Sequence, residues 1–119
     1  MELRSGVMEF DGTLVKVSVH AARRYRQRGP GRSTTERAMR TIATRVIEAV
    51  YSGSLIEVDR HTHLAIVGNN GARPVYAVVS VTGLAERPVA IVVKTILSGE
   101  MATHTFGHMI GVLNELAAA

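Results

Sequence analysis

The segment from His20 to Gly29 reads HAARRYRQRG and combines one imidazole with four guanidinium groups. His20, Arg24 and Arg28 are four residues apart, so a helix would rotate each by only about 40° from the one before and place all three on one face. Like charges at this spacing repel each other, and the segment contains no acidic residue to offset them. An imidazole exchanges protons near neutral pH, and an arginine fork matches two phosphate oxygens. The pattern therefore predicts a site for an anion, and we expect RNA as the partner.

Basic charge is concentrated in the first part of the chain. Residues 1–50 hold ten of the 14 Lys and Arg but five of the ten Asp and Glu, which gives a net charge of +5 there and −1 in the remainder. Such asymmetry favours a polyanionic partner. We expect four further side chains to extend the nucleic-acid surface, namely Arg23, Tyr25, Arg32 and Arg40.

Two alternatives remain open for this segment. The whole helix could be a solvated basic face, with His20 half-buried at its start. Tyr25, the one aromatic residue of the segment, could stack on a base or pack inward. The sequence does not decide either point.

The composition excludes several classes of protein. The chain has 119 residues, which fits one domain over residues 1–119, and it contains no Cys, so disulfides, thiol catalysis and Cys-ligated zinc are excluded. The first residues lack the basic and apolar regions of a signal peptide. The longest apolar stretch, from Pro88 to Leu97, is strand-sized and carries Lys94. We expect a soluble cytoplasmic protein without a membrane anchor.

The residues before the basic segment are typical of a β-hairpin. Two β-prone arms, residues 7–10 and 13–17, flank the tight-turn dipeptide Asp11-Gly12. Ser18 is a suitable cap for a helix over residues 19–28, which Gly29 and Pro30 would end.

A second helix has the strongest periodic pattern. Residues 33–36 read STTE, which fits a capping box, and apolar residues recur at helical spacing from Ala38 to Val50. We expect this amphipathic helix to end near Gly53.

The remaining pattern predicts four consecutive strands. Residues 55–58 and 64–67 flank a short turn, and the Val- and Ile-rich runs 75–81 and 89–96 follow. Residues 68–71, GNNG, read as a turn. We therefore expect an α+β fold in which an N-terminal hairpin and two helices pack on one face of a four-stranded antiparallel sheet, with an added C-terminal helix.

The string His-Ala-x-x-Arg-x-x-x-Arg-Gly, followed by a helix ending at Tyr51-Ser52-Gly53 and by four strands, resembles the RelE-like and barnase-like ribonuclease toxins. It resembles in particular the small toxin-related families with this helix signature. The similarity covers residues 18–97 and leaves residues 98–119 as a C-terminal helical extension. Members fold as one or two helices followed by a four-stranded antiparallel sheet. Active members cleave RNA without a metal, using basic residues and a His or Tyr.

The resemblance implies roles for particular residues. His20, Arg24 and Arg28 match the helix signature, and Lys94 and Thr95 lie in the final strand, where such toxins place a catalytic or phosphate-binding group. A ribose 2′-hydroxyl would attack the adjacent phosphate, with His20 as general acid or base and Thr95 orienting a phosphate oxygen. Arg24, Arg28 and Lys94 would stabilise the developing charge. We expect no cofactor.

This chain departs from the family pattern in three ways. Its second helix is longer, the hairpin before the first helix is extra, and a helix is appended after Leu97. These departures bear on activity more than on fold, because an extension can cover a sheet face where RNA would bind. A rival hypothesis keeps the fold without the chemistry: a phage- or mobile-element-encoded inhibitor that binds a host protein or a nucleic-acid machine. A third is a module that binds RNA without cutting it.

Two other features suggest binding of different kinds. The histidine pairs His61/His63 and His104/His108 could ligate a metal, but no Glu follows His104 as in metalloproteases, so we expect surface residues and no metal site. The Met and Leu stripe of the C-terminal helix could form a homodimer contact or bind an antitoxin or host protein. The alternative is that this stripe covers the sheet.

Overall fold

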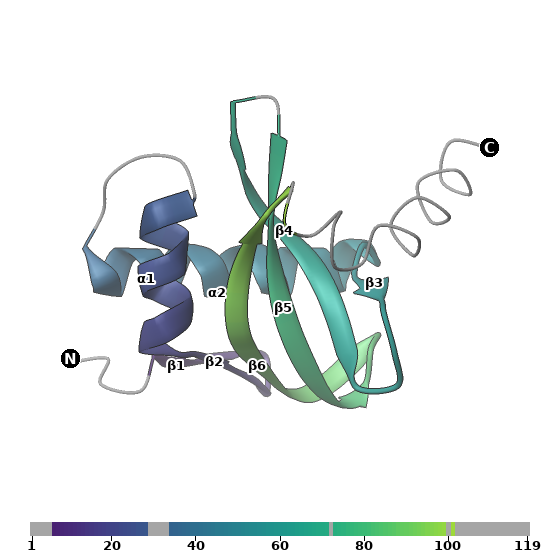
Figure 1. The fold of residues 1–119 in the computed structure, drawn as a ribbon. Coiled ribbons are helices and arrows are strands. Elements are labelled where there is room, and N and C mark those ends of the chain that lie inside the picture. The colour runs from purple at the N-terminus through teal and green to yellow at the C-terminus, as the bar shows by residue number, and fades with distance from the viewer. Residues whose placement is uncertain (1–5, 29–33, 72, 100, 102–119) are drawn as a thin grey trace.

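The computed structural model describes residues 6–28, 34–71, 73–99 and 101 of the chain. These form an α+β fold of two helices and six strands (Figure 1). In chain order the elements are β1 (Val7–Phe10), β2 (Thr13–Val17), α1 (Val19–Arg28), α2 (Thr35–Ser52), β3 (Ile56–Glu57), β4 (Thr62–Asn70), β5 (Arg73–Leu84) and β6 (Arg87–Ser98).

All six strands belong to one mixed sheet with the order β1-β2-β6-β5-β4-β3. Strands β3 to β6 form the antiparallel meander that the sequence predicts. The expectation of a four-stranded sheet with a separate hairpin is wrong, because β2 pairs in parallel with β6, from Leu14 opposite Ala90 to Val17 opposite Val93. The side chains of β2 alternate between buried and exposed, and pairing with β6 places one face of the strand in the core. The Thr13 hydroxyl also donates a 2.7 Å hydrogen bond to the Pro88 carbonyl.

The helix α1 has the bounds that the sequence predicts. Ser18 caps it, since its hydroxyl accepts a 3.0 Å hydrogen bond from the backbone N–H of Ala21. An Ala and Tyr face of α1, made of Ala21, Ala22 and Tyr25, is buried against the sheet and α2. The predicted stop at Gly29 and Pro30 lies outside the described residues.

The helix α2 begins one residue later than a capping box at Ser33 would require. Thr34 is the N-cap and its hydroxyl accepts from the N–H of Arg37 at 3.2 Å, so the third helical position carries a cation rather than the carboxylate of Glu36. The predicted end is confirmed: Gly53 has φ +69°, and its N–H bonds to the Val50 carbonyl.

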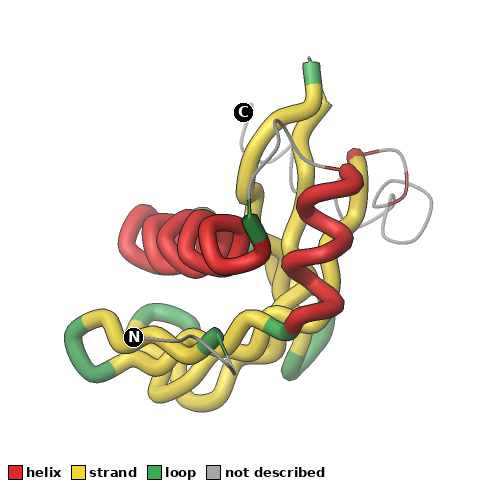
Figure 2. Tube along the Cα trace, turned by 90° about the vertical axis from the view of Figure 1, so that its left-hand side faces the viewer, coloured by secondary structure: helices red, strands yellow, loops and turns green. Residues whose placement is uncertain are grey.

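Both helices pack on the same face of the sheet. α1 contacts β6 and α2, while α2 contacts β4 and β2. Figure 2 shows α2 above the β1–β2 hairpin and beside the main strands, so the bent sheet wraps around this helix. The apolar side of α2 supplies much of the core, whose fully buried side chains include Met39, Ile42, Val46, Val79 and Val93.

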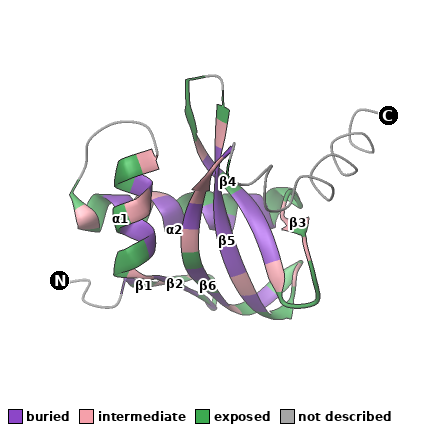
Figure 3. Ribbon diagram, in the orientation of Figure 1, coloured by how far each residue is buried: buried purple, intermediate pink, exposed green. Residues whose placement is uncertain are grey.

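The opposite face of the sheet, which we call the outer face, carries a smaller apolar cluster. Leu64, Tyr76 and Val78 are buried there, with Leu97 packed against them. The Val-rich strand β5 therefore has apolar neighbours on both faces, as Figure 3 shows by its nearly continuous burial.

The later part of the chain differs from the sequence-based expectation at residues 68–71. Residues Gly68 to Asn70 are not a turn but pair with β5, and the chain reverses after them, where Gly71 has φ +64°. The predicted C-terminal helix lies outside the described residues except at its first positions. Within the described part of the chain, neither helix is long and apolar enough to cross a membrane.

Truncation of the core under α2 should destabilise the fold. Ile42 is fully buried, so we expect Ile42→Ala to lower the free energy of unfolding by about 2–5 kcal/mol, through lost apolar burial and the cavity it leaves. The matched control is Ile66→Ala on β4, where the side chain is 49% exposed and the loss should stay below about 1 kcal/mol. Urea denaturation measures both, and equal losses would contradict this placement of the core.

Burial raises the pKa of Tyr76 above its usual value of 10.0. The neutral phenol is therefore favoured by folding, and its contribution to stability is complete below about pH 10 and lost as the pH rises through the raised pKa. We expect the free energy of unfolding to fall less steeply above pH 10 in Tyr76→Phe than in the unchanged protein. Denaturant unfolding at a series of alkaline pH values tests this, and identical slopes would refute it.

Candidate functional site

The site predicted from the sequence depends on how α1 meets β6. Pairing between β2 and β6 stops at Val93, although β6 continues to Ser98. At this point β2 ends, Ser18 begins α1, and the helix runs beside the remaining half of β6 (Figure 1). The Ser18 hydroxyl lies 3.5 Å from the Lys94 carbonyl. The helix thus occupies the edge of β6 that β2 leaves open.

A β-bulge in β6 lies at the same place. Val78 of β5 is opposite Thr95 and Val79 is opposite Val93, so Lys94 has no partner in the ladder. Val93 and Ile96 are both fully buried on the helix-covered face, while Lys94 is exposed and Thr95 is half-buried between them. A bulge of this kind redirects side chains, and such irregularities are frequent beside active sites.

The imidazole of His20 and the hydroxyl of Thr95 are in contact. His20 Nε2 lies 3.3 Å from Thr95 Oγ1, although 75 positions separate the two residues in the chain. The pair is exposed to solvent. Two residues that the sequence places in different elements, a helix and the last strand, therefore share one surface.

Arg28, two turns along the helix from His20, also reaches β6. Its Nη1 atom donates a 2.7 Å hydrogen bond to the carbonyl of Ile96 in a partly buried position. Arg24 lies between His20 and Arg28 on the same helix face, and its Nη1 donates to Gln27 Oε1 at 2.9 Å. A guanidinium carries five N–H donors, so each arginine retains donors for a further acceptor.

We call these five residues, His20, Arg24, Arg28, Lys94 and Thr95, the α1–β6 site. Within the described residues no carboxylate contacts any of them: their hydrogen-bond partners are a hydroxyl, an amide oxygen and a backbone carbonyl. Three cationic side chains and one imidazole therefore line this edge of the sheet without a neutralising anion. An arrangement of this kind attracts a phosphate group.

The tip of the β4–β5 hairpin supports the end of α1. Asn70 Nδ2 donates to the carbonyl of Arg28 at 3.2 Å, which satisfies one of the carbonyls that a helix end leaves unpaired. Arg73 is paired with Asn70 in the ladder, and both line a pocket of about 190 Å³ that Ser98 of β6 also lines. Asn70 and Arg73 could not be assigned to this region from the sequence, because only the sheet topology brings the hairpin to this helix end.

The four expected accessory residues do not form one surface. Arg23 is exposed, one turn of α1 from His20, and can extend the site. Tyr25 is 6% exposed and packs inward, where burial raises the pKa of its phenol and the charge of Arg45 partly opposes that rise. Stacking of Tyr25 on a base is therefore wrong for this conformation. Arg40 lines a hollow on the solvent side of α2 with Arg45 and Glu48.

Arg32 lies outside the described residues. So do His104 and His108, the second of the two histidine pairs. In the part of the chain that is described, no three His, Asp or Glu side chains gather as a metal site would require. His61 is exposed in the turn before β4, as expected. The expectation of a surface residue is wrong for His63, which is buried on β4 because its strand position faces the sheet interior, with its Nδ1 unpaired among the described residues.

Comparisons of the chain with protein-family models, with curated proteins and with solved structures give no significant match.

The bond between Arg28 and β6 should contribute to stability. Replacing Arg28 with Met keeps much of the apolar stem but removes the donor to the Ile96 carbonyl, so we expect a loss of about 1–2 kcal/mol in the free energy of unfolding. Arg23→Met is the matched control, because it removes a positive charge from the same helix at a residue that makes no hydrogen bond to the described part of the sheet. If both variants unfold at the same urea concentration, Arg28 does not anchor α1 to β6.

Proposed function

We propose that this domain binds RNA at the α1–β6 site and cleaves it without a metal. The observation that carries the proposal is the 3.3 Å contact between His20 Nε2 and Thr95 Oγ1, which joins the basic helix to the exposed Lys94-Thr95 bulge. Arg24 and Arg28 lie on the same helix as the imidazole and Lys94 is adjacent to Thr95, and within the described residues no carboxylate contacts these side chains. An imidazole beside cations suits phosphate chemistry on a polyanion.

The chemistry follows from these groups. The ribose 2′-oxygen bonds to the adjacent phosphorus, the bond from phosphorus to the 5′-oxygen breaks, and the products are a 2′,3′-cyclic phosphate and a 5′-hydroxyl. His20 accepts the 2′-hydroxyl proton at Nδ1, the nitrogen that the Thr95 contact leaves accessible, and water gives a proton to the leaving 5′-oxygen. Arg24, Arg28 and Lys94 stabilise the charge that develops on the phosphate oxygens.

In this proposal Thr95 positions His20 rather than a phosphate oxygen. With Nδ1 as the proton acceptor, the neutral imidazole carries its proton on Nε2 and donates it to the Thr95 hydroxyl, which restrains the ring. Arg28 has a double role, because one of its donors anchors α1 to the Ile96 carbonyl while the others remain for the substrate.

The resemblance to the RelE-like and barnase-like ribonuclease toxins belongs to the same proposal. Two helices followed by an antiparallel meander agree with what that resemblance implies for residues 18–97. The N-terminal hairpin extends the edge of the sheet instead of covering its outer face. This departure from the family pattern therefore leaves the α1–β6 site accessible, which favours an active ribonuclease over an inactive relative.

Incubation of the purified protein with total RNA, followed by mapping of the cut ends, tests the proposal. We expect fragments that end in a 2′,3′-cyclic phosphate and begin with a 5′-hydroxyl, at a rate that EDTA does not change. Loss of the imidazole in His20→Ala should slow cleavage by about 100-fold or more. The control His61→Ala changes an exposed histidine outside the site and should cleave normally. Equal rates for His20→Ala and the unchanged protein would refute the assignment.

A salt titration separates cleavage from binding. The logarithm of the RNA-binding constant should fall linearly with the logarithm of the salt concentration. Arg24→Gln should reduce the magnitude of this slope by about one, which corresponds to the loss of one phosphate contact. Binding of this kind without cleavage would retain the RNA partner and refute the catalytic step. Absence of both would remove the RNA proposal and favour the rival, an inhibitor directed at a host protein.

A further inference from the structure

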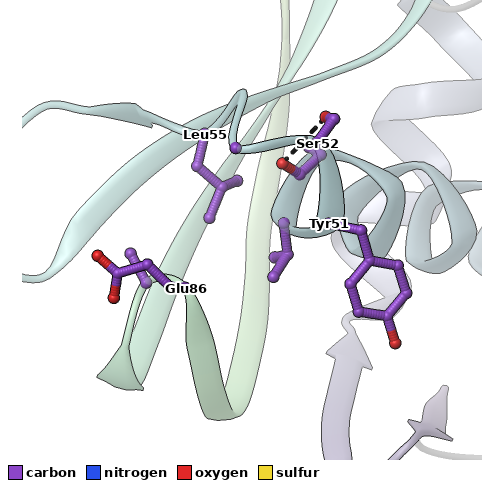
Figure 4. A pocket seen from close by; sticks show the side chains of 8 residues that line it. Tyr51, Ser52, Leu55 and Glu86 are labelled. Atoms are coloured by element: carbon purple, nitrogen blue, oxygen red, sulfur yellow. Dashed lines mark hydrogen bonds between the residues drawn. The ribbon is translucent and has the colours of Figure 1, made fainter.

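A second hollow lies at the C-terminal end of α2. It has a volume of about 490 Å³ and lies between the last turn of α2, the segment that follows it and the β5–β6 turn (Figure 4). Its lining includes Val50, Tyr51, Leu55, Ala85 and Glu86. None of these residues belongs to the α1–β6 site.

The hollow combines apolar walls with an exposed aromatic ring. Val50, Leu55 and Ala85 form an apolar lining, and Tyr51 is 63% exposed beside it. The Tyr51 hydroxyl donates to Asp11 Oδ2 at 3.4 Å, which holds the ring near the end of the β1–β2 hairpin. An exposed tyrosine at the rim of an apolar hollow is typical of a binding surface.

The charge of the hollow is negative. Glu86 lies across it from Tyr51, and its carboxylate has no hydrogen bond or ion pair with any described residue (Figure 4). The last turn of α2 contains no basic residue, so the negative end of the helix dipole is not offset there. Glu86 and the helix end together favour a cation.

The hollow is remote from the α1–β6 site. Arg26 of α1 donates to Thr35 at the first residue of α2, so α1 lies at the N-terminal end of that helix. The 18 residues of α2 span roughly 27 Å, and the hollow lies at the other end. An RNA segment at this hollow would be repelled by Glu86 and Asp11, so a different class of partner fits here.

We propose that this hollow binds a partner protein through a basic residue next to an apolar one. The apolar side chain fills the space between Val50, Leu55 and Ala85, and the guanidinium or ammonium group pairs with Glu86. Charge complementarity carries the choice of a basic segment, and the apolar lining requires a side chain beside the charge. The inference does not depend on whether the α1–β6 site cleaves RNA.

Two capped dipeptides serve as probes. The full-length protein, labelled with ¹⁵N, is titrated with N-acetyl-leucyl-arginine amide and with N-acetyl-leucyl-glutamate amide. We expect the arginyl probe to shift amide signals of residues 49–55, 85 and 86, and the glutamyl probe to bind more weakly. Glu86→Gln should weaken binding of the arginyl probe by about threefold, so that the arginyl and glutamyl probes bind with equal affinity. Glu36→Gln, which removes a carboxylate at the opposite end of α2, is the matched control and should change nothing.

Other outcomes would overturn the inference. Shifts confined to His20, Thr95 and their neighbours would place the probe at the cationic site. Equal affinity of Glu86→Gln and the unchanged protein would remove the carboxylate from recognition. If spermidine, which has no apolar side chain, displaces the arginyl probe at equal concentration, the hollow takes a free cation and not a protein segment. Tyr51→Ala should weaken binding of the arginyl probe, whereas Tyr51→Phe, which keeps the aromatic ring, should bind it with unchanged affinity.

Discussion

The arrangement of this molecule depends on where the parallel pairing of β2 with β6 stops. The two strands share hydrogen bonds only up to Val17 and Val93, and beyond them β6 has an open edge. An open edge exposes unpaired backbone groups, and this fold covers it with a helix instead of another strand. Arg28 supplies a donor to the Ile96 carbonyl that a neighbouring strand would otherwise provide. The cationic face of α1 is therefore attached to the sheet by the same contact that protects the edge.

Local patterns were sufficient for most elements and insufficient for their assembly. Ser18 and Gly53 mark helix boundaries through backbone chemistry that operates within a few residues, and both were predicted correctly. The cap of α2 was misplaced by one residue because Ser33 and Thr34 are equally suitable caps. The parallel pairing of β2 with β6 could not be predicted, since it joins segments about 75 residues apart and leaves no local signal. The contacts of Thr95 with His20 and of Asn70 with α1 follow from that pairing.

The two proposed binding surfaces differ in charge and lie at opposite ends of α2. The N-terminal end of this helix adjoins α1 and its arginines, whereas the C-terminal end adjoins Glu86 and Asp11. The buried side of α2 packs against the sheet along its whole length. A rigid helix of this kind keeps the two surfaces at a fixed separation, so an anionic and a cationic partner can be held at the same time without contact between them.

The bulge at Lys94 has a consequence for how this sequence can vary. In a regular strand successive side chains alternate between the two faces, but here Lys94 and Thr95 are consecutive between two core residues, Val93 and Ile96. Deleting Lys94 would restore the alternation with Val93 and Ile96 still in the core, but it would turn Thr95 to the outer face, away from His20. Descendants of this sequence can therefore change the side chain at position 94 more freely than they can change the number of residues between Val93 and Ile96.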